Sequence, residues 1–204
     1  MQMKSSWFLW GLVVVLAALA GFWVAERASN PVPQLTSGTW FPQPRPIEDF
    51  ALTDESSQPF TLASLKGRPT LVFFGFTHCP DVCPTTLLKL AQIAKAAAIP
   101  NLSVVLVSVD PARDKPEQLQ TYVHAFDAHF KGLTGDQAQI DKISREFGVA
   151  VARVELSGGD YTMDHSAAVF LLDDQARRVA VFTPPFEIQP VANDLRSVAA
   201  LLKG

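Results

Sequence analysis

Cys79 and Cys83 are the only thiols in this chain of 204 residues, and they lie four positions apart. On a helix this spacing puts both side chains on one face, with Cβ atoms about 5–6 Å apart. At that separation two thiolates can bind one metal ion or form a disulfide with each other. The pair could therefore hold a metal, exchange electrons or attack a substrate.

The residues around the pair predict where it lies in a fold. The apolar run 70–76 predicts a strand buried on both faces, and residues 87–98 predict a helix after the cysteines. Functional groups of open α/β sheets lie at this kind of strand end. Because unpaired N–H groups at a helix start favour negative charge, we expect both thiol pKa values to fall. A structural disulfide is a poor alternative, since so small a loop removes little unfolded-state entropy.

The four histidines of the chain differ in what they could add to two thiolates. We expect His78 to pack in a loop against the strand end, and His124 and His129 to be solvated. His165 comes just before a predicted strand, 166–172, and would reach the thiols if that strand is an antiparallel neighbour of the first buried one. Two thiolates and one imidazole suit copper, because soft sulfur selects Cu(I) and imidazole accepts either copper oxidation state.

The remaining pattern alternates strands with helices and ends in a hairpin and a helix. This order predicts an α/β fold, with a mixed sheet flanked by helices. Besides the segments already named, the pattern predicts strands over 102–109, 149–156 (at the sheet edge) and 178–183, and helices over 117–126, 136–147 and 191–202.

The N-terminal segment predicts a membrane anchor. Residues 7–25 carry no charge, and as a helix they would span about 28 Å, close to the roughly 30 Å of a bilayer core. Lys4 before the run keeps the N-terminus in the cytoplasm, so the domain is expected on the periplasmic side of the inner membrane, held by a single-pass transmembrane helix. The alternative is a signal peptide cleaved at Ala18-Leu19-Ala20, which places the domain in the same compartment.

Composition completes the domain organisation. We expect an anchor over 1–27, a proline-rich extended spacer over 28–46, and one globular domain over 47–204. A hydrophobic content of 48% supplies a core, and a net charge of −3 gives no footprint for nucleic acid as a partner.

Three motifs resemble those of the Sco/SenC family of copper chaperones. They are Phe-Gly-Phe-Thr-His-Cys-Pro-Asp-Val-Cys-Pro over 74–84, Val-Asp-Pro-Ala-Arg-Asp over 109–114, and Asp-His-Ser over 164–166. The resemblance implies a thioredoxin-like fold, with Cys79, Cys83 and His165 as ligands of copper, as Cu(I) and also Cu(II). It further implies an upstream copper donor and delivery of copper to the oxidase subunit that carries the CuA site of cytochrome c oxidase. The expected protein is a metallochaperone rather than an enzyme.

Two other activities use the same thiols. A thiol–disulfide oxidoreductase that reduces cysteines of an oxidase subunit needs an accessible pair, although a spacing of two residues between the cysteines is the usual redox arrangement. A peroxidase of the peroxiredoxin type needs threonine three positions before Cys83, where this chain has Pro80.

Overall fold

The computed structural model describes residues 5–28 and 33–202, which fall into two units, 1–32 and 33–204. The described part of the first unit is one helix, α1 (Ser5–Ala28). Its apolar side chains between Trp10 and Trp23 are exposed. None of the helices in the described ranges combines the length and the apolar character that a membrane crossing needs. The transmembrane segment expected over 7–25 therefore stays a prediction.

The second unit is built on an eight-stranded sheet with the strand order β1-β10-β9-β4-β5-β6-β2-β3. Three central strands, β4, β5 and β6, run parallel, and the other pairs are antiparallel, so the sheet is mixed as predicted. The strands of this sheet are β1 (Gly38–Arg45), β2 (Ala51–Asp54), β3 (Pro59–Thr61), β4 (Thr70–Gly75), β5 (Ser103–Ser108), β6 (Lys131–Thr134), β9 (Val169–Leu172) and β10 (Arg178–Phe182).

Strand β4 is the centre of the sheet and leads directly to the cysteines. All six of its residues are buried, which explains why its sequence is continuously apolar rather than alternating. It pairs with β5 on one side and antiparallel with β9 on the other, where Phe73 is the register partner of Val169. The antiparallel neighbour that His165 needs in order to reach the thiols is therefore present.

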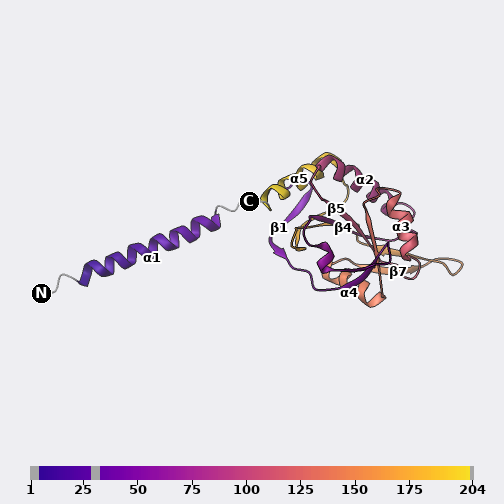
Figure 1. Cartoon of the computed structure of the whole chain (residues 1–204), viewed down its shortest axis with the longest axis horizontal. Coiled ribbons are helices and arrows are strands. Elements are labelled where there is room, and N and C mark those ends of the chain that lie inside the picture. Colours follow the sequence, from indigo (N-terminus) through magenta and orange to yellow (C-terminus); the bar gives the residue numbers. More distant parts are fainter. Residues whose placement is uncertain (1–4, 29–32, 203–204) are drawn as a thin grey trace. The chain divides into compact units, whose positions relative to one another are not determined.

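Helices cover both faces of the sheet, as predicted. Figure 1 shows α2 (Val82–Ala97), α3 (Pro116–His124) and α5 (Ile188–Leu201) on one side and α4 (Gln137–Phe147) on the other. The buried side chains of α2 recur every three or four positions, so one stripe of the helix faces the core. They are Cys83, Thr86, Leu87, Leu90, Ile93 and Ala97. A short 3-10 turn, η1 (Leu62–Leu65), precedes β4.

The segment expected to be a spacer, 28–46, is partly in the sheet. Strand β1 pairs antiparallel with β10 and forms one edge. The buried carboxylate of Asp194, in α5, accepts hydrogen bonds from the backbone N–H groups of Thr36, Ser37 and Gly38 at 2.7–3.2 Å. Proline content misleads here because an edge strand tolerates residues that cannot donate to the ladder.

A second, two-stranded sheet differs most from the sequence-based expectation. Strand β7 (Val151–Glu155), predicted at the edge of the main sheet, instead pairs only with β8 (Tyr161–His165) in the described domain. Strand β8 is absent from the prediction. No residue of β8 is buried, so its sequence carries no clear hydrophobic alternation that would have indicated a strand.

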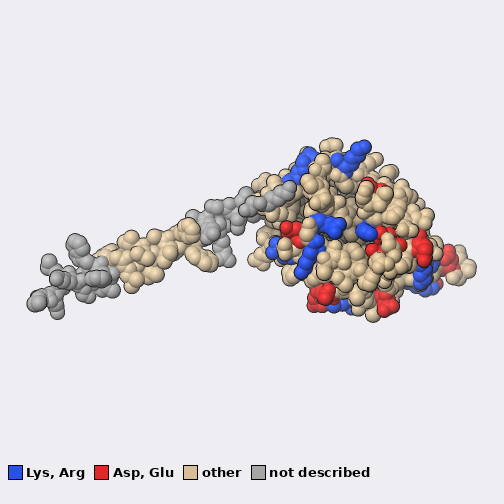
Figure 2. Space-filling model, viewed as in Figure 1, with Lys and Arg blue, Asp and Glu red and all other residues tan. Residues whose placement is uncertain are grey.

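One face of the domain carries charged side chains of both signs (Figure 2). On the face shown in Figure 2, Lys and Arg are interspersed with Asp and Glu. The side chains of α1 over 10–23, the part of this helix that is not drawn in grey, are uncharged (Figure 2).

Candidate metal centre

The two cysteines lie where β4 gives way to α2. Cys79 lies in the connecting turn, and its N–H donates to the carbonyl of Phe76 at 3.3 Å. Cys83 lies in the first turn of α2, and its N–H donates to the Sγ of Cys79 at 3.4 Å. Both thiols are free. Cys83 is fully buried, whereas Cys79 is half-buried, so solvent reaches the pair from the Cys79 side.

His165 completes a cluster of three metal-binding side chains. It is the last residue of β8, and its Nε2 lies 3.4 Å from the Sγ of Cys83. The ligand atoms of Cys79, Cys83 and His165 all lie within 4.8 Å of one another. The fold brings these three predicted residues together because β9, which follows His165, runs antiparallel beside β4, which precedes the cysteines.

The surroundings of His165 present its Nε2 to the thiols. Its Nδ1 lies 3.2 Å from the carbonyl oxygen of Ser166, which can only accept, so Nδ1 carries the proton and donates it. In the neutral ring, Nε2 then has a free lone pair directed at Cys83. Burial lowers the pKa of the His165 imidazole below its ordinary value and keeps it neutral. The rings of Phe73 and Phe76 pack edge-on against it, with centroids 6.0 and 5.9 Å away.

The expectation that both thiol pKa values fall is wrong for Cys83. Burial raises the pKa of the Cys83 thiol far above its ordinary value. The loss of hydration by a fully buried sulfur outweighs the attraction of the helix start for negative charge. In the metal-free protein Cys83 is therefore a neutral thiol, and it becomes a thiolate only when a cation takes the place of its proton.

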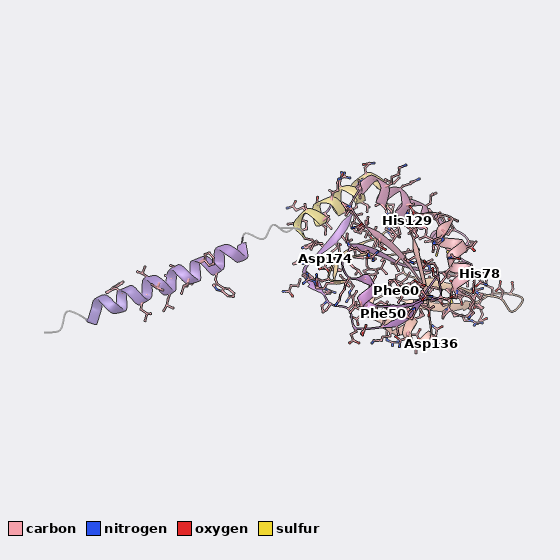
Figure 3. All side chains as sticks on the ribbon, viewed as in Figure 1. Phe50, Phe60, His78, His129, Asp136 and Asp174 are labelled. Carbon is pink, nitrogen blue, oxygen red and sulfur yellow. The ribbon has the colours of Figure 1, made fainter. Side chains whose placement is uncertain are left out.

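The other histidines stand apart from the cluster. His124 and His129 are exposed, as expected, and His129 contacts Asp127. His78, which was expected to pack against the strand end, is instead exposed, and its Nδ1 lies 3.0 Å from the hydroxyl of Thr77. Figure 3 shows His78 and His129 at separate places on the domain.

The family model described as SCO1/SenC matches residues 42–200 of this chain. The chain belongs to the SCO1/SenC family. A SCO2-like protein of Rickettsia conorii is 37% identical over 138 residues, which are 66% of this chain and 67% of that protein.

Solved structures of two family proteins have the same fold. ScoI of Bradyrhizobium japonicum with copper bound matches with a TM-score of 0.68 at 41% identity, covering 74% of this chain and 97% of that one. ScoI of Arabidopsis thaliana with copper bound matches with a TM-score of 0.72 at 29% identity, covering 76% and 98%. The fold is therefore the thioredoxin-like, mixed α/β fold of SCO1/SenC proteins, as the resemblance implied.

In this SCO1/SenC chain, one residue that supports the cysteine turn was not predicted from the sequence. Asp114 is fully buried and accepts hydrogen bonds from the hydroxyls of Thr77 and Ser108, both at 2.6 Å. A buried carboxylate must find such donors, because an unpaired charge in the interior is costly. Its position in the motif 109–114 was the available signal, but the spacing alone gave it no partner.

Proposed function

We propose that this chain is a copper-binding metallochaperone in which Cys79, Cys83 and His165 hold the metal. The observation that carries the proposal is the approach of two sulfurs and one imidazole nitrogen to within 4.8 Å of one another. The donor set favours copper as the cargo, because thiolates select Cu(I) and an imidazole can remain a ligand in Cu(II). The copper-bound structures of two relatives support the same choice.

Titration of the full-length reduced protein with Cu(I), against a competing chelator, tests the site. Replacing His165 by Ala removes a direct ligand, so binding should weaken by at least the roughly 10–100-fold that loss of an outer partner of a metal site costs. His129→Ala is the matched control, since His129 is exposed and lies outside the cluster. Equal affinities of the wild type and the His165→Ala variant would refute the three-ligand site.

The recipient we propose is the CuA site of cytochrome c oxidase, in the oxidase subunit that carries it, with a separate upstream protein as copper donor. Support comes from membership of the SCO1/SenC family. Copper that is delivered must also leave, and the half-buried Cys79 gives a recipient's ligands a side from which to approach. Oxidase assembly in cells carrying Cys79→Ser, Cys83→Ser or His165→Ala tests delivery. Loss of assembly that added copper restores is the expected result.

A second candidate function, disulfide reduction, is favoured by one observation. The thiols are free, and one is accessible while its neighbour is buried, which suits an attacking and a resolving cysteine. In that reaction the two thiols become a disulfide, and the substrate disulfide receives their two electrons and two protons to become two thiols. Turnover of a disulfide peptide by the reduced protein tests it. Absence of turnover, together with rescue of oxidase assembly by copper, leaves delivery alone.

We propose that the domain works on the periplasmic side of the inner membrane. The support is the charge-free run 7–25 preceded by Lys4 in the sequence. A thiol reagent that cannot cross membranes should label Cys79 in intact spheroplasts. Labelling only after lysis would place the domain in the cytoplasm and contradict the proposal. The mass of the purified mature protein then decides between a retained segment and cleavage after Ala20.

A further inference from the structure

One loop, residues 110–114, is hydrogen-bonded both to the turn that carries the cysteines and to the strand that carries His165. It connects β5 to α3 and contains the motif Asp-Pro-Ala-Arg-Asp. On the cysteine side, Asp114 accepts from the backbone N–H of Thr77 at 3.1 Å and from its hydroxyl at 2.6 Å. Thr77 lies two positions before Cys79, so Asp114 fixes the start of the turn that carries this thiol.

On the histidine side, the same loop holds Tyr161, the first residue of β8. The phenol of Tyr161 donates to Asp110 Oδ1 at 2.9 Å, and Arg113 Nη1 donates to the carbonyl of Tyr161 at 3.0 Å. The guanidinium of Arg113 also stacks 3.7 Å from the centre of the Tyr161 ring. His165 is the last residue of this same strand.

The loop itself is fixed internally. The N–H of Asp114 donates to the carbonyl of Asp110 at 2.9 Å, and the N–H of Asp110 donates to the hydroxyl of Ser108 at 3.0 Å. Arg113 pairs with the carboxylate of Asp110, which is 3% exposed. These bonds link the residues that contact the cysteine turn to those that contact Tyr161.

The β7–β8 hairpin depends on this loop for its polar attachment. It has no ladder to the main sheet within the described residues. Two hydrogen bonds of His165 go elsewhere, to Cys83 and to the adjacent carbonyl of Ser166. The other hydrogen bonds described between residues 151–165 and the rest of the domain all end on the loop. Val151 and Met163 add apolar packing at the base of the hairpin.

We propose that the loop 110–114 is a positioning element that sets the distance between the cysteine thiols and His165, with Arg113, Asp110 and Asp114 as positioning residues. This proposal rests on the proposed function in one respect, because it takes the distance between the thiols and the imidazole to set the affinity for copper. A loosened loop leaves all three ligands in the chain but raises the cost of bringing the imidazole to the sulfurs.

The test compares variants of the loop contacts in two backgrounds of the full-length protein. Tyr161→Phe removes only the hydrogen bond to Asp110, and Arg113→Lys removes the planar fork that stacks and donates. We expect Cu(I) binding to weaken about fivefold and tenfold respectively in the wild-type background, and to be unchanged by either substitution in the His165→Ala background. Equal losses in both backgrounds would show a general structural effect and overturn the proposal, as would no loss in either.

Arg153→Lys is the matched control. The guanidinium of Arg153 also lies 3.7 Å from the Tyr161 ring centre, necessarily on the opposite face, but it pairs with Glu155 of its own hairpin. The Cu(I) affinity of the Arg153→Lys variant should stay within about twofold of the wild type.

A metal-free measurement separates this proposal from the proposed function. Amide hydrogen exchange at residues 161–165 of the apo protein should accelerate in Tyr161→Phe and Arg113→Lys but not in Arg153→Lys. If the wild-type protein fails to bind copper, the function is refuted while this exchange pattern still supports the positioning loop. Unchanged exchange in all three variants overturns the loop's role whatever the copper result.

Discussion

The Nε2 of His165 lies 3.4 Å from the Sγ of Cys83, although 82 positions separate the two residues in the chain. The contact arises from strand pairing rather than from either motif alone. The end of β4 leads into the cysteine turn, and β9, which starts soon after His165, lies antiparallel beside β4 with Val169 opposite Phe73. Both segments therefore reach the same end of the sheet, where a buried thiol and a neutral imidazole face each other.

The unequal burial of the thiols predicts unequal reactivity. Cys83 is fully buried with a raised thiol pKa, whereas Cys79 is half-buried. Since alkylation needs an accessible thiolate, iodoacetamide should modify Cys79 at least about tenfold faster than Cys83 in the reduced, metal-free protein. Peptide mass spectrometry over time measures both rates. In urea the two rates should converge, and comparable rates in the native protein would contradict the described burial.

Gly75 is predicted to be indispensable to the position of Cys83. A Cβ at Gly75 would lie 3.0 Å from the Sγ of Cys83 and 3.1 Å from the ring of Phe73. Gly75→Ala should therefore lower the free energy of unfolding by about 1–3 kcal/mol, as overpacking does, and should also weaken copper binding. Urea unfolding and Cu(I) competition measure the two effects.

Gly148→Ala provides the control for that substitution. Gly148 has a φ of +71° at the end of α4, and a Cβ added there would meet no atom within 4 Å. Alanine at this position costs about 1–2 kcal/mol through the left-handed backbone alone. Its copper affinity should stay at the wild-type value. A similar loss of affinity in both variants would mean that global stability, rather than the Cys83 position, controls binding.

Asp194 is predicted to hold the N-terminal strand on the sheet. Its carboxylate accepts from the N–H groups of Thr36, Ser37 and Gly38 and from the hydroxyl of Thr36 at 3.1 Å. Asp194→Ala leaves these donors unpaired and should lower the free energy of unfolding by about 2–4 kcal/mol. Amide exchange over 36–45 should accelerate most.

The exposed residue Asp174 supplies the comparison for Asp194. Asp174→Ala should change the free energy of unfolding by less than about 0.5 kcal/mol, as surface substitutions usually do. If Asp194→Ala left exchange over 36–45 unchanged, pairing between β1 and β10 would be sufficient without the carboxylate.

The burial of His165 predicts an acid-sensitive stability in the metal-free protein. Its folded-state pKa lies below the ordinary 6.5, so the unfolded chain binds the proton more readily than the folded one. The stability from the neutral imidazole is therefore fully present above about pH 6.5 and is lost as the pH falls toward the lower, folded-state pKa. Between pH 8 and pH 5, the free energy of unfolding measured in urea should fall less for His165→Gln than for the wild type. The same dependence of the free energy of unfolding on pH in both proteins would mean that His165 is not desolvated.

Much of the fold was predictable because its central elements carry strong local patterns. The continuous apolar run of β4, the helical spacing after Cys83 and the proline at the start of α3 each indicate one structure. The strand predicted over 149–156 is present as β7, but its partner β8 and the edge strand β1 were not predicted, since β8 has no buried residue and β1 contains prolines. Such segments form strands through their partners rather than through their own sequence.

The sequence by itself determined the donor types and the chemistry they favour, because sulfur and imidazole bring their metal preferences with them. Through the motifs that resemble those of the family, it also indicated His165, among the four histidines, as the candidate metal ligand. Only the tertiary structure decided that Cys83 is a neutral, buried thiol and that Asp114 and Arg113 tie the two halves of the centre together. Burial and long-range hydrogen bonds depend on which surfaces come into contact in the folded chain. Contacts between segments that are far apart in the sequence leave no local pattern from which they could be predicted.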